Sequence, residues 1–221
     1  MSVTPVVVDM AVGGRQRELP SGSSTTARSR CRSSLIYKLD VGPKGETTEG
    51  RRGRVSRLPA AQASVPPGAT QVFRIQWVGK ADIKKSESYI FSVNQIPVKL
   101  PKSVSGVQIV FNFAVVVNVA PPGGVADLKY IGAGTGKDDK GKIRPAITVE
   151  NTGNMHAYLL EATINLSAVV SKSLAPGDIR QLMGLGLVQP GKQRRFLVPV
   201  DLPAGVGNVT ASISYKRKTA R

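Results

Sequence analysis

Side chains that could carry covalent chemistry are sparse in this chain. His156 is the only histidine and Cys31 the only cysteine, and no Ser-His-Asp set or metal-ligand cluster can be recognised. His156 follows the turn-forming sequence ENTGN, and we expect it at the surface rather than as a general base. The glycine-rich sequence GAGTGK lacks the spacing of a phosphate-binding loop. These observations argue against an enzyme, a metal site and a cofactor.

The stretch VQIVFNFAVVVNV, residues 107–119, favours a binding function, in which the main chain pairs with an apolar partner. Its Val, Ile and Phe residues predict one long β-strand. It is too short and too polar to cross a bilayer, which needs about 20 apolar residues. Because side chains alternate across a strand, its odd positions form an unbroken apolar face. These positions are Val107, Ile109, Phe111, Phe113, Val115, Val117 and Val119.

The rest of the chain must position this strand, and its sequence pattern predicts an all-β protein. Strand-like runs bounded by turn residues recur along the chain, which has 23 Gly and 15 Pro. Only the sequence DIRQLMGLGLVQPGKQRRF indicates a short helical turn. A chain of 221 residues can hold two immunoglobulin-like sandwiches of about 100 residues each. The turn-forming sequence PPGG, residues 121–124, is the best hinge, so we expect domains at 1–121 and 122–221.

The N-terminal region begins with a strand-like sequence. We expect one strand from Val3 to Met10 and, from Glu18 to Ser34, a Ser/Thr/Arg-rich stretch typical of a disordered linker. No pattern of a signal peptide precedes the first strand. We expect either that the numbering starts at the mature end or that the protein is not exported.

Several ordered motifs together resemble the periplasmic pilus (fimbrial) chaperones of the chaperone-usher pathway, which are PapD-like proteins, and most closely their archaic branch. The resemblance covers most of the chain. The motifs are TPVVVDM, PPGATQVFRIQWVG, SYIFSVNQIPV, GVQIVFNFAVVVNVAPPG, RPAITVENTGN and LVQPGKQRRFLVPVDLP.

The resemblance implies two immunoglobulin-like domains in an L-shaped arrangement and a function without catalysis. Such a chaperone binds pilin subunits that lack a strand, donates its own strand to them in the periplasm, and delivers them to an outer-membrane usher. Aligned by the long strand, the donor positions fall on Val107, Ile109, Phe111, Phe113 and Val115. The alternative is that these side chains fill the protein's own core, and it applies more strongly to Val117 and Val119.

The resemblance also implies a basic anchor for the carboxylate at the end of the subunit. In many members one basic residue lies on the first strand and one on the long strand. This sequence has Val116 at the second position and no basic residue before Arg15 at the first. Arg74 and Lys99 are therefore the candidate anchors, and a bidentate contact favours Arg74. The alternative for Arg74 is a solvated strand arginine.

Two Arg/Ser/Gly-rich stretches interrupt the expected strand pattern at residues 18–35 and 50–60. With GC-rich codons and a shift of two bases, the first stretch reads ASVRVVNDGAKPLPVE. With a shift of one base, the second reads ADEDEFLVFPP. Because both alternatives have the pattern of family strands, we hypothesise that both stretches come from shifted reading frames. The given sequence would otherwise leave the first domain without two strands of its sandwich.

The net charge of +17 is the main support for a competing interpretation, a basic nucleic-acid-binding β protein. The two suspect stretches supply much of this charge, and no basic-aromatic interleaving indicates a stacking platform for bases. A structural pilus or surface subunit is a further alternative. It is disfavoured because such subunits lack a strand, whereas this chain keeps its long donor-like strand inside two halves that look complete apart from the two suspect stretches.

The reading-frame hypothesis predicts base changes at two places in the coding DNA. We expect accurate resequencing of codons 15–62 to restore both alternative strands and to remove Cys31. An unchanged DNA sequence, together with an intact protein mass that matches the printed sequence, would contradict the hypothesis.

Overall fold

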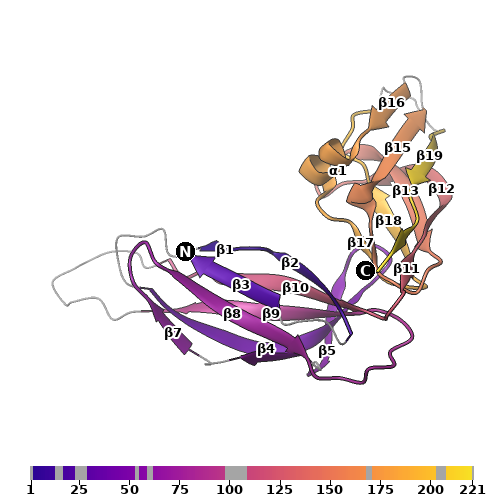
Figure 1. The fold of residues 1–221 in the computed structure, drawn as a ribbon. Coiled ribbons are helices and arrows are strands. Elements are labelled where there is room, and N and C mark those ends of the chain that lie inside the picture. Colours follow the sequence, from indigo (N-terminus) through magenta and orange to yellow (C-terminus); the bar gives the residue numbers. More distant parts are fainter. Residues whose placement is uncertain are drawn as a thin grey trace. The chain divides into compact units, whose positions relative to one another are not determined.

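The computed structural model describes residues 2–12, 17–22, 29–52, 55–58, 62–97, 109–167, 171–202 and 208–220. The chain divides into two compact units (Figure 1). Unit 1 consists of Met1–Leu39, Glu49–Ile83 and Glu87–Val119. Unit 2 consists of Asp40–Thr48, Lys84–Ser86 and Ala120–Arg221.

Unit 1 is built from two β-sheets that face each other, as in a β-sandwich. One sheet has the order β1-β3-β8-β6, with bounds Ser2–Val3, Arg17–Gly22, Thr70–Trp77 and Val55–Leu58. The other has the order β2-β10-β9-β4-β5, and β7 pairs with β4. Its strands are β2 (Val7–Ala11), β10 (Asn112–Ala120), β9 (Glu87–Ile96), β4 (Ser29–Val41), β5 (Thr47–Arg52) and β7 (Gln62–Val65).

The core of unit 1 lies between these two sheets. Alternate residues of β8 are buried, and two aromatic contacts join β8 to β9 in the opposite sheet. Phe73 meets Phe91 edge-on with ring centroids 6.1 Å apart, and Trp77 lies 6.0 Å from Tyr89. Such aromatic pairs add stabilisation beyond the area that they bury. The buried cluster is Val3, Val8, Met10, Val12, Val65, Phe73, Ile75, Trp77, Tyr89, Phe91, Val93, Val115, Val117 and Val119.

The prediction of a disordered linker at Glu18–Ser34 is wrong over the described residues. Strand β3 pairs with β8 from Arg17↔Ile75 to Gly22↔Thr70, and β4 pairs with β9 on one edge and β7 on the other. The second suspect stretch contributes β6, which pairs with β8. Ladder hydrogen bonds are made by the main chain, so a polar stretch can pair where neighbouring strands offer an edge. The sequence as printed therefore has strands at both places.

The N-terminal strand and the long strand also differ from their predictions. The expected strand Val3–Met10 is divided into β1 and β2, which belong to different sheets, so the chain changes sheet between Val3 and Val7. Strand β10 begins at Asn112 rather than at residue 107, since Ile109–Phe111 lie outside the regular ladder. These three residues extend past the buried core that holds the rest of the strand in place.

Unit 2 contains two three-stranded sheets and two short pairs of strands. The three-stranded sheets have the orders β12-β13-β18 and β16-β15-β19, and the pairs are β11-β20 and β14-β17. Their bounds are β11 (Val125–Ala126), β12 (Leu128–Lys137), β13 (Ile143–Asn151), β14 (Ala157–Tyr158), β15 (Ala162–Ser167), β16 (Ser171–Leu174), β17 (Leu187–Val188), β18 (Gln193–Leu197), β19 (Thr210–Tyr215) and β20 (Lys218–Thr219). Its buried side chains include Ile147, Val149, Leu159, Ile164, Leu174, Ile179 and Val188.

The expected helical turn is confirmed as α1, Pro176–Met183, and a 3₁₀ turn, η1, spans Leu159–Glu161. Helix α1 begins with Pro176, whose missing N–H is not needed at that position. The Asp178 carboxylate accepts the N–H of Ala175 at 3.0 Å. The helix ends before Gly184, which has a φ of 71°.

His156 is buried in unit 2, with 5% of its surface exposed, so the prediction of a surface position is wrong. Its ring lies edge-on to Tyr158 at 5.4 Å. Its main-chain N–H donates to the Ser86 hydroxyl at 2.7 Å. The position is explained by packing, because the turn at ENTGN leads directly into the buried strand β14.

The turn at ENTGN is organised by Asn151, whose side chain is fully buried. Its amide donates to the carbonyls of Met155 and Val188, at 2.7 and 3.0 Å. Its carbonyl oxygen accepts the N–H groups of Gly153 and Asp127, at 3.0 and 3.3 Å. Gly153 is required because a Cβ there would lie 2.0 Å from the carbonyl oxygen of Val125.

Replacing Asn151 with Ala is expected to lower the free energy of unfolding by about 2–4 kcal/mol, because up to four buried or partly buried hydrogen bonds to backbone groups are lost. Urea unfolding followed by circular dichroism measures the change. Asn165→Ala is the matched control, since Asn165 is exposed on β15, and it is expected to stay within about 0.5 kcal/mol of the parent. An equal effect of both variants would contradict this role of Asn151.

Candidate functional site

The apolar face of β10 divides into a buried half and an exposed half. Val115, Val117 and Val119 are 0% exposed, and they belong to the core of unit 1. Phe113 is partly buried against that core. Further out, Ile109 and Phe111 are 67% and 44% exposed. The same face of one segment therefore continues from the core into solvent.

The exposed half keeps the order of a strand at its inner end. The rings of Phe111 and Phe113 stack with centroids 6.0 Å apart. The main chain of Phe111 is held by Gln95 of β9, since the Gln95 N–H donates to the Phe111 carbonyl at 2.8 Å. The Gln95 side-chain oxygen accepts the Phe111 N–H at 3.3 Å. The aromatic side chains are thus presented from a backbone that is already extended and paired.

The hydrogen-bond register of β9 and β10 determines which main-chain groups of β10 face the other way. Phe111 is bonded to Gln95, and the pairing continues without a shift from Asn112↔Asn94 to Val119↔Glu87. In an antiparallel ladder the bonded pairs alternate with non-bonded pairs. The odd residues of β10 therefore bond to β9, and the N–H and C=O of Asn112, Ala114 and Val116 point to the opposite edge.

Strand β2 covers only the inner part of that opposite edge. The Val116 N–H donates to the carbonyl of Val6 at 3.0 Å, just before β2 begins at Val7. The preceding segment, β1, pairs with β3 in the other sheet. Within the described part of the chain, no main-chain partner is found for the outward groups of Asn112 and Ala114. The change of sheet at the N-terminus thus leaves the outer half of β10 as an open sheet edge.

A buried polar contact lies at the inner end of β10. Asn118 is 0% exposed. Its side-chain oxygen accepts the Ser88 hydroxyl at 2.6 Å, and its amide donates to the Asp9 carboxylate at 3.0 Å. Ser88 lies on β9 and Asp9 on β2, so this one side chain connects the middle strand to both neighbours.

This contact is well placed to fix the register of β10. The odd face is apolar throughout, so a slip by two residues would still present apolar side chains to the core. The connection from Ile96 to Asn112 is also too long for a tight turn to set the pairing. Fixing register is the best-supported use of a buried polar side chain. Asn118 therefore positions the exposed residues at the other end of the strand.

A disulfide trap tests this role of Asn118. Asn94 and Asn112 form a non-bonded pair, whose Cα separation suits a disulfide. In a Cys31→Ser background, Asn94→Cys and Asn112→Cys are expected to cross-link efficiently. Adding Asn118→Val is expected to lower that yield. In a second variant, which carries Ser92→Cys in place of Asn94→Cys, Asn118→Val is expected to allow cross-linking between positions 92 and 112, because a slip by two residues brings them opposite each other. Mass spectrometry of peptides measures both yields.

Val117→Ala is the control for this experiment, because it weakens the core and keeps Asn118. A loss of the 94–112 cross-link in both variants would mean that destabilisation alone is responsible, and the register role would then be wrong.

Of the two candidate anchors, only Arg74 belongs to the described residues. Arg74 is exposed on β8, between the core residues Phe73 and Ile75, so it lies on the outward face of the other sheet. Val116, at the position of the usual basic residue, is partly buried on β10. Val107 and Lys99 lie outside the described residues, and the anchor stays a prediction.

Other site chemistries find little support in the described residues. The sequence GAGTGK belongs to the extended strand β12, so its backbone does not form a phosphate-binding loop. In the part of the chain that the structure describes, no three His, Cys, Asp or Glu side chains gather into a group suited to a metal ion. Among the described residues, no helix has the length and apolar character of a membrane span.

Sequence reasoning missed the polar residues that hold the exposed strand. Gln95 and Asn118 are polar residues within strands that are otherwise rich in apolar residues, and their pairing partners follow only from the register. The only sequence signal is a polar residue that interrupts an apolar run, as Asn118 does between two valines.

The overall fold matches solved structures of fimbrial chaperones. A chain in the complex of Salmonella enterica SafA pilin with the SafB chaperone is 11% identical, with a TM-score of 0.59 over 96% of this chain and 95% of that one. The class 5 fimbriae chaperone CfaA is 16% identical, with a TM-score of 0.57 over 97% and 98%. A chain in the CsuC–CsuE complex of chaperone and tip adhesion subunit from the archaic Csu pili of Acinetobacter baumannii is 11% identical, with a TM-score of 0.53 over 89% of each chain.

No family model and no curated protein sequence matches the chain. At these identities the structural likeness shows the fold, which is the two-domain β-sandwich fold of the fimbrial chaperones. The all-β, two-domain prediction is thereby confirmed.

Proposed function

We propose that this protein is a periplasmic chaperone for pilin subunits, which it binds by donating the outer half of β10. The observation that carries the proposal is the exposed apolar pair Ile109 and Phe111 beside an open sheet edge. The fold of the fimbrial chaperones supports it. We propose residues 1–121 as the donor domain and 122–221 as the second domain, with the segments Asp40–Thr48 and Lys84–Ser86 of the first range belonging to unit 2.

The physical requirement on such a chaperone is to cover an incomplete sandwich. A subunit that lacks a strand exposes an apolar groove and an unpaired strand edge, which promote aggregation. Exposed alternating apolar side chains can fill the groove. At the same time, the outward N–H and C=O of Asn112 and Ala114 can pair with the subunit's edge strand. The outer half of β10 offers both features together.

The donor set that we propose is centred on Ile109, Phe111 and Phe113. Val107, at the outer end, lies outside the described residues. Val115, at the inner end, is fully buried in unit 1, which favours the interpretation that it fills the protein's own core. Arg74 and Lys99 remain the proposed anchors of the subunit carboxylate, and delivery to an outer-membrane usher completes the proposed function.

The competing functions lack a supporting observation. A nucleic-acid-binding role rests on net charge, which is concentrated in part in the two suspect stretches. A structural pilus subunit would lack one strand of its own sandwich, whereas β10 here completes a sheet of unit 1. Two of the matched structures are complexes of a chaperone with a tip adhesion subunit or with a pilin.

Charge introduced on the exposed half of β10 is expected to abolish subunit binding. Ile109→Asp and Phe111→Asp are made separately, and each is co-expressed with the pilin encoded next to this protein. We expect the amount of soluble pilin to fall at least about tenfold, because burying an unpaired carboxylate in an apolar groove costs several kcal/mol. Val78→Asp is the matched control, since Val78 is 60% exposed elsewhere in unit 1. Undiminished soluble pilin with both variants would overturn the donor assignment.

Ala114→Pro tests the main-chain part of the same proposal. The Ala114 N–H points away from β9, so proline there should leave the ladder with β9 intact. It removes one main-chain donor from the open edge. We expect the purified variant to unfold within a few degrees of the parent and to hold pilin less well. Retention of pilin at the parental level would mean that the open edge is not used.

A further inference from the structure

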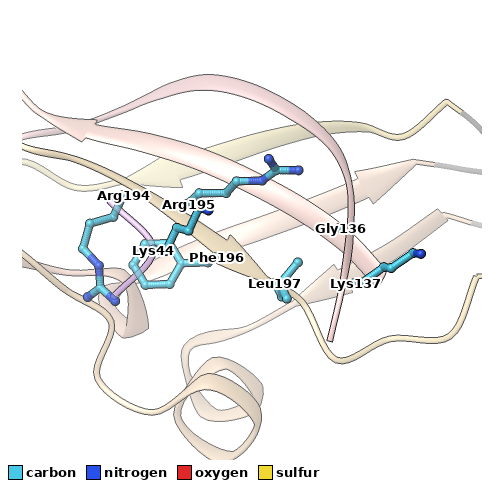
Figure 2. A pocket seen from close by; sticks show the side chains of 7 residues that line it. All are labelled: Lys44, Gly136, Lys137, Arg194, Arg195, Phe196 and Leu197. Atoms are coloured by element: carbon cyan, nitrogen blue, oxygen red, sulfur yellow. The ribbon is translucent and has the colours of Figure 1, made fainter. Parts of the chain in front are cut away.

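Unit 2 carries a hollow of about 400 Å³ that the proposed function does not use. It is lined by residues of three segments, namely the loop before β5, the end of β12, and β18 (Figure 2). The lining residues are Lys44, Gly136, Lys137, Arg194, Arg195, Phe196 and Leu197. We call this surface the basic hollow.

The described cations of the basic hollow form no close ion pair, although the negative charge of Glu46 acts on Arg194 from a greater distance. Among the described residues, no carboxylate lies within salt-bridge distance of Lys44, Lys137, Arg194 or Arg195. Glu46 is the acid nearest in the loop, and its carboxylate accepts the main-chain N–H of Lys44 at 2.8 Å. Four cations face the hollow and the one carboxylate of Glu46 acts on them, so the hollow carries a local excess of positive charge.

Other basic side chains of unit 2 do have acidic partners. Lys142 contacts Asp201 at 2.7 Å, and Arg144 contacts Asp138 at 2.9 Å. Hydrogen bonding to Arg144 is the main reason why the pKa of Asp138 is lowered. The cations of the hollow lack such close partners among the described residues, so their charge is available to a negatively charged partner.

Arg194 is held rigidly at one end of the basic hollow. Its guanidinium lies over the Phe196 ring, 4.5 Å from the ring centroid, and donates to the Leu187 carbonyl. The Nε atom is buried and has no hydrogen-bond partner among the described residues. Gly45, with a φ of 93°, leaves room for this group, because a Cβ there would lie 2.6 Å from Nη2 of Arg194. Burial lowers the pKa of Arg194.

Arg195 is oriented from the adjacent position of the same strand. Its Nη2 donates to the Thr135 carbonyl of β12 at 2.6 Å, and its main-chain N–H donates to the Pro43 carbonyl at 2.7 Å. Both arginines therefore keep defined positions, so less side-chain freedom is lost when a partner binds.

The positive charges are spread along the basic hollow rather than directed at one point. Figure 2 shows the guanidinium groups of Arg194 and Arg195 pointing to different sides, with the ammonium group of Lys137 further along. Between them lie Phe196 and Leu197, and Leu197 is 38% exposed. A single small anion can meet only one of these groups closely. An extended chain with several carboxylates and intervening apolar side chains matches both the charges and the apolar surface.

We propose that the basic hollow is a binding site for an extended acidic segment of a partner protein. The segment places carboxylates against Arg194, Arg195 and Lys137, and an apolar side chain against Leu197. This site lies wholly within unit 2, and it does not depend on the donor role of β10.

The probe for this proposal is a fluorescein-labelled peptide of alternating glutamate and leucine, with binding measured by fluorescence anisotropy on the full chain. We expect saturable binding that weakens as salt rises. Arg194→Gln with Arg195→Gln is expected to raise Kd about tenfold or more, since each lost charge-assisted contact accounts for roughly a tenfold change. Lys137→Gln and Arg195→Gln alone are expected to give smaller increases.

Lys216→Gln with Arg217→Gln is the matched control, because it removes the same charge from exposed positions of unit 2. It is expected to change Kd by less than about threefold. Equal weakening by both double variants would mean non-specific attraction, and it would overturn the proposal. Absence of saturable binding would overturn it as well.

Two further probes separate an acidic segment from other anions. Inorganic phosphate, or vesicles containing anionic phosphatidylglycerol, is added to the complex of the protein with the labelled peptide. The proposal is supported if phosphate displaces the peptide only at concentrations at which the ionic strength alone weakens binding. Displacement by low phosphate would instead identify a phosphate site, and binding to vesicles that depends on Arg194 and Arg195 would identify a membrane surface. Either result would overturn the acidic-segment proposal.

Discussion

The antiparallel ladder between β9 and β10 is the constraint on which the rest of unit 1 depends. It fixes two directions at once, because side chains alternate between the faces of the sheet while main-chain groups alternate between its edges. On β10 the odd side chains face the core, and the even main-chain groups face the edge that β2 covers only in part. One register therefore decides both which side chains stabilise the protein and which backbone groups remain open.

An open edge beside exposed aromatic residues is ordinarily a liability for a soluble β protein. Here the liability is limited in extent. β2 closes the edge from Val116 inward, and the exposed ladder carries the polar Asn112 and the small Ala114. The apolar side chains at risk are those of Ile109 and Phe111, which are exposed beyond the core. A short edge of this kind suits temporary pairing with a partner that is itself missing a strand.

Much of this arrangement was predictable from the sequence, because apolar alternation over residues 107–119 directly encodes a strand with one apolar face. The point at which that face leaves the core was not predictable. Val115 and Phe111 are both large apolar residues at odd positions, and only the lengths of the neighbouring strands separate the buried one from the exposed one. The change of sheet after Val3 was missed for a similar reason, since both β1 and β2 read as one apolar run.

Burial of His156 and pairing of the Arg-rich stretches were also missed, because both depend on contacts that are distant in sequence. The positive charge of the molecule comes from two groups of basic residues that must be considered separately. Under the reading-frame hypothesis, the arginines at positions 28–32 and 51–57 would be replaced. Lys137, Arg194 and Arg195 lie outside both suspect stretches, and their positions are set by β12 and β18. The net charge of the chain does not distinguish these two groups of basic residues. The structure assigns the second group to one surface of unit 2, so that surface stays basic whichever reading frame the N-terminal region has.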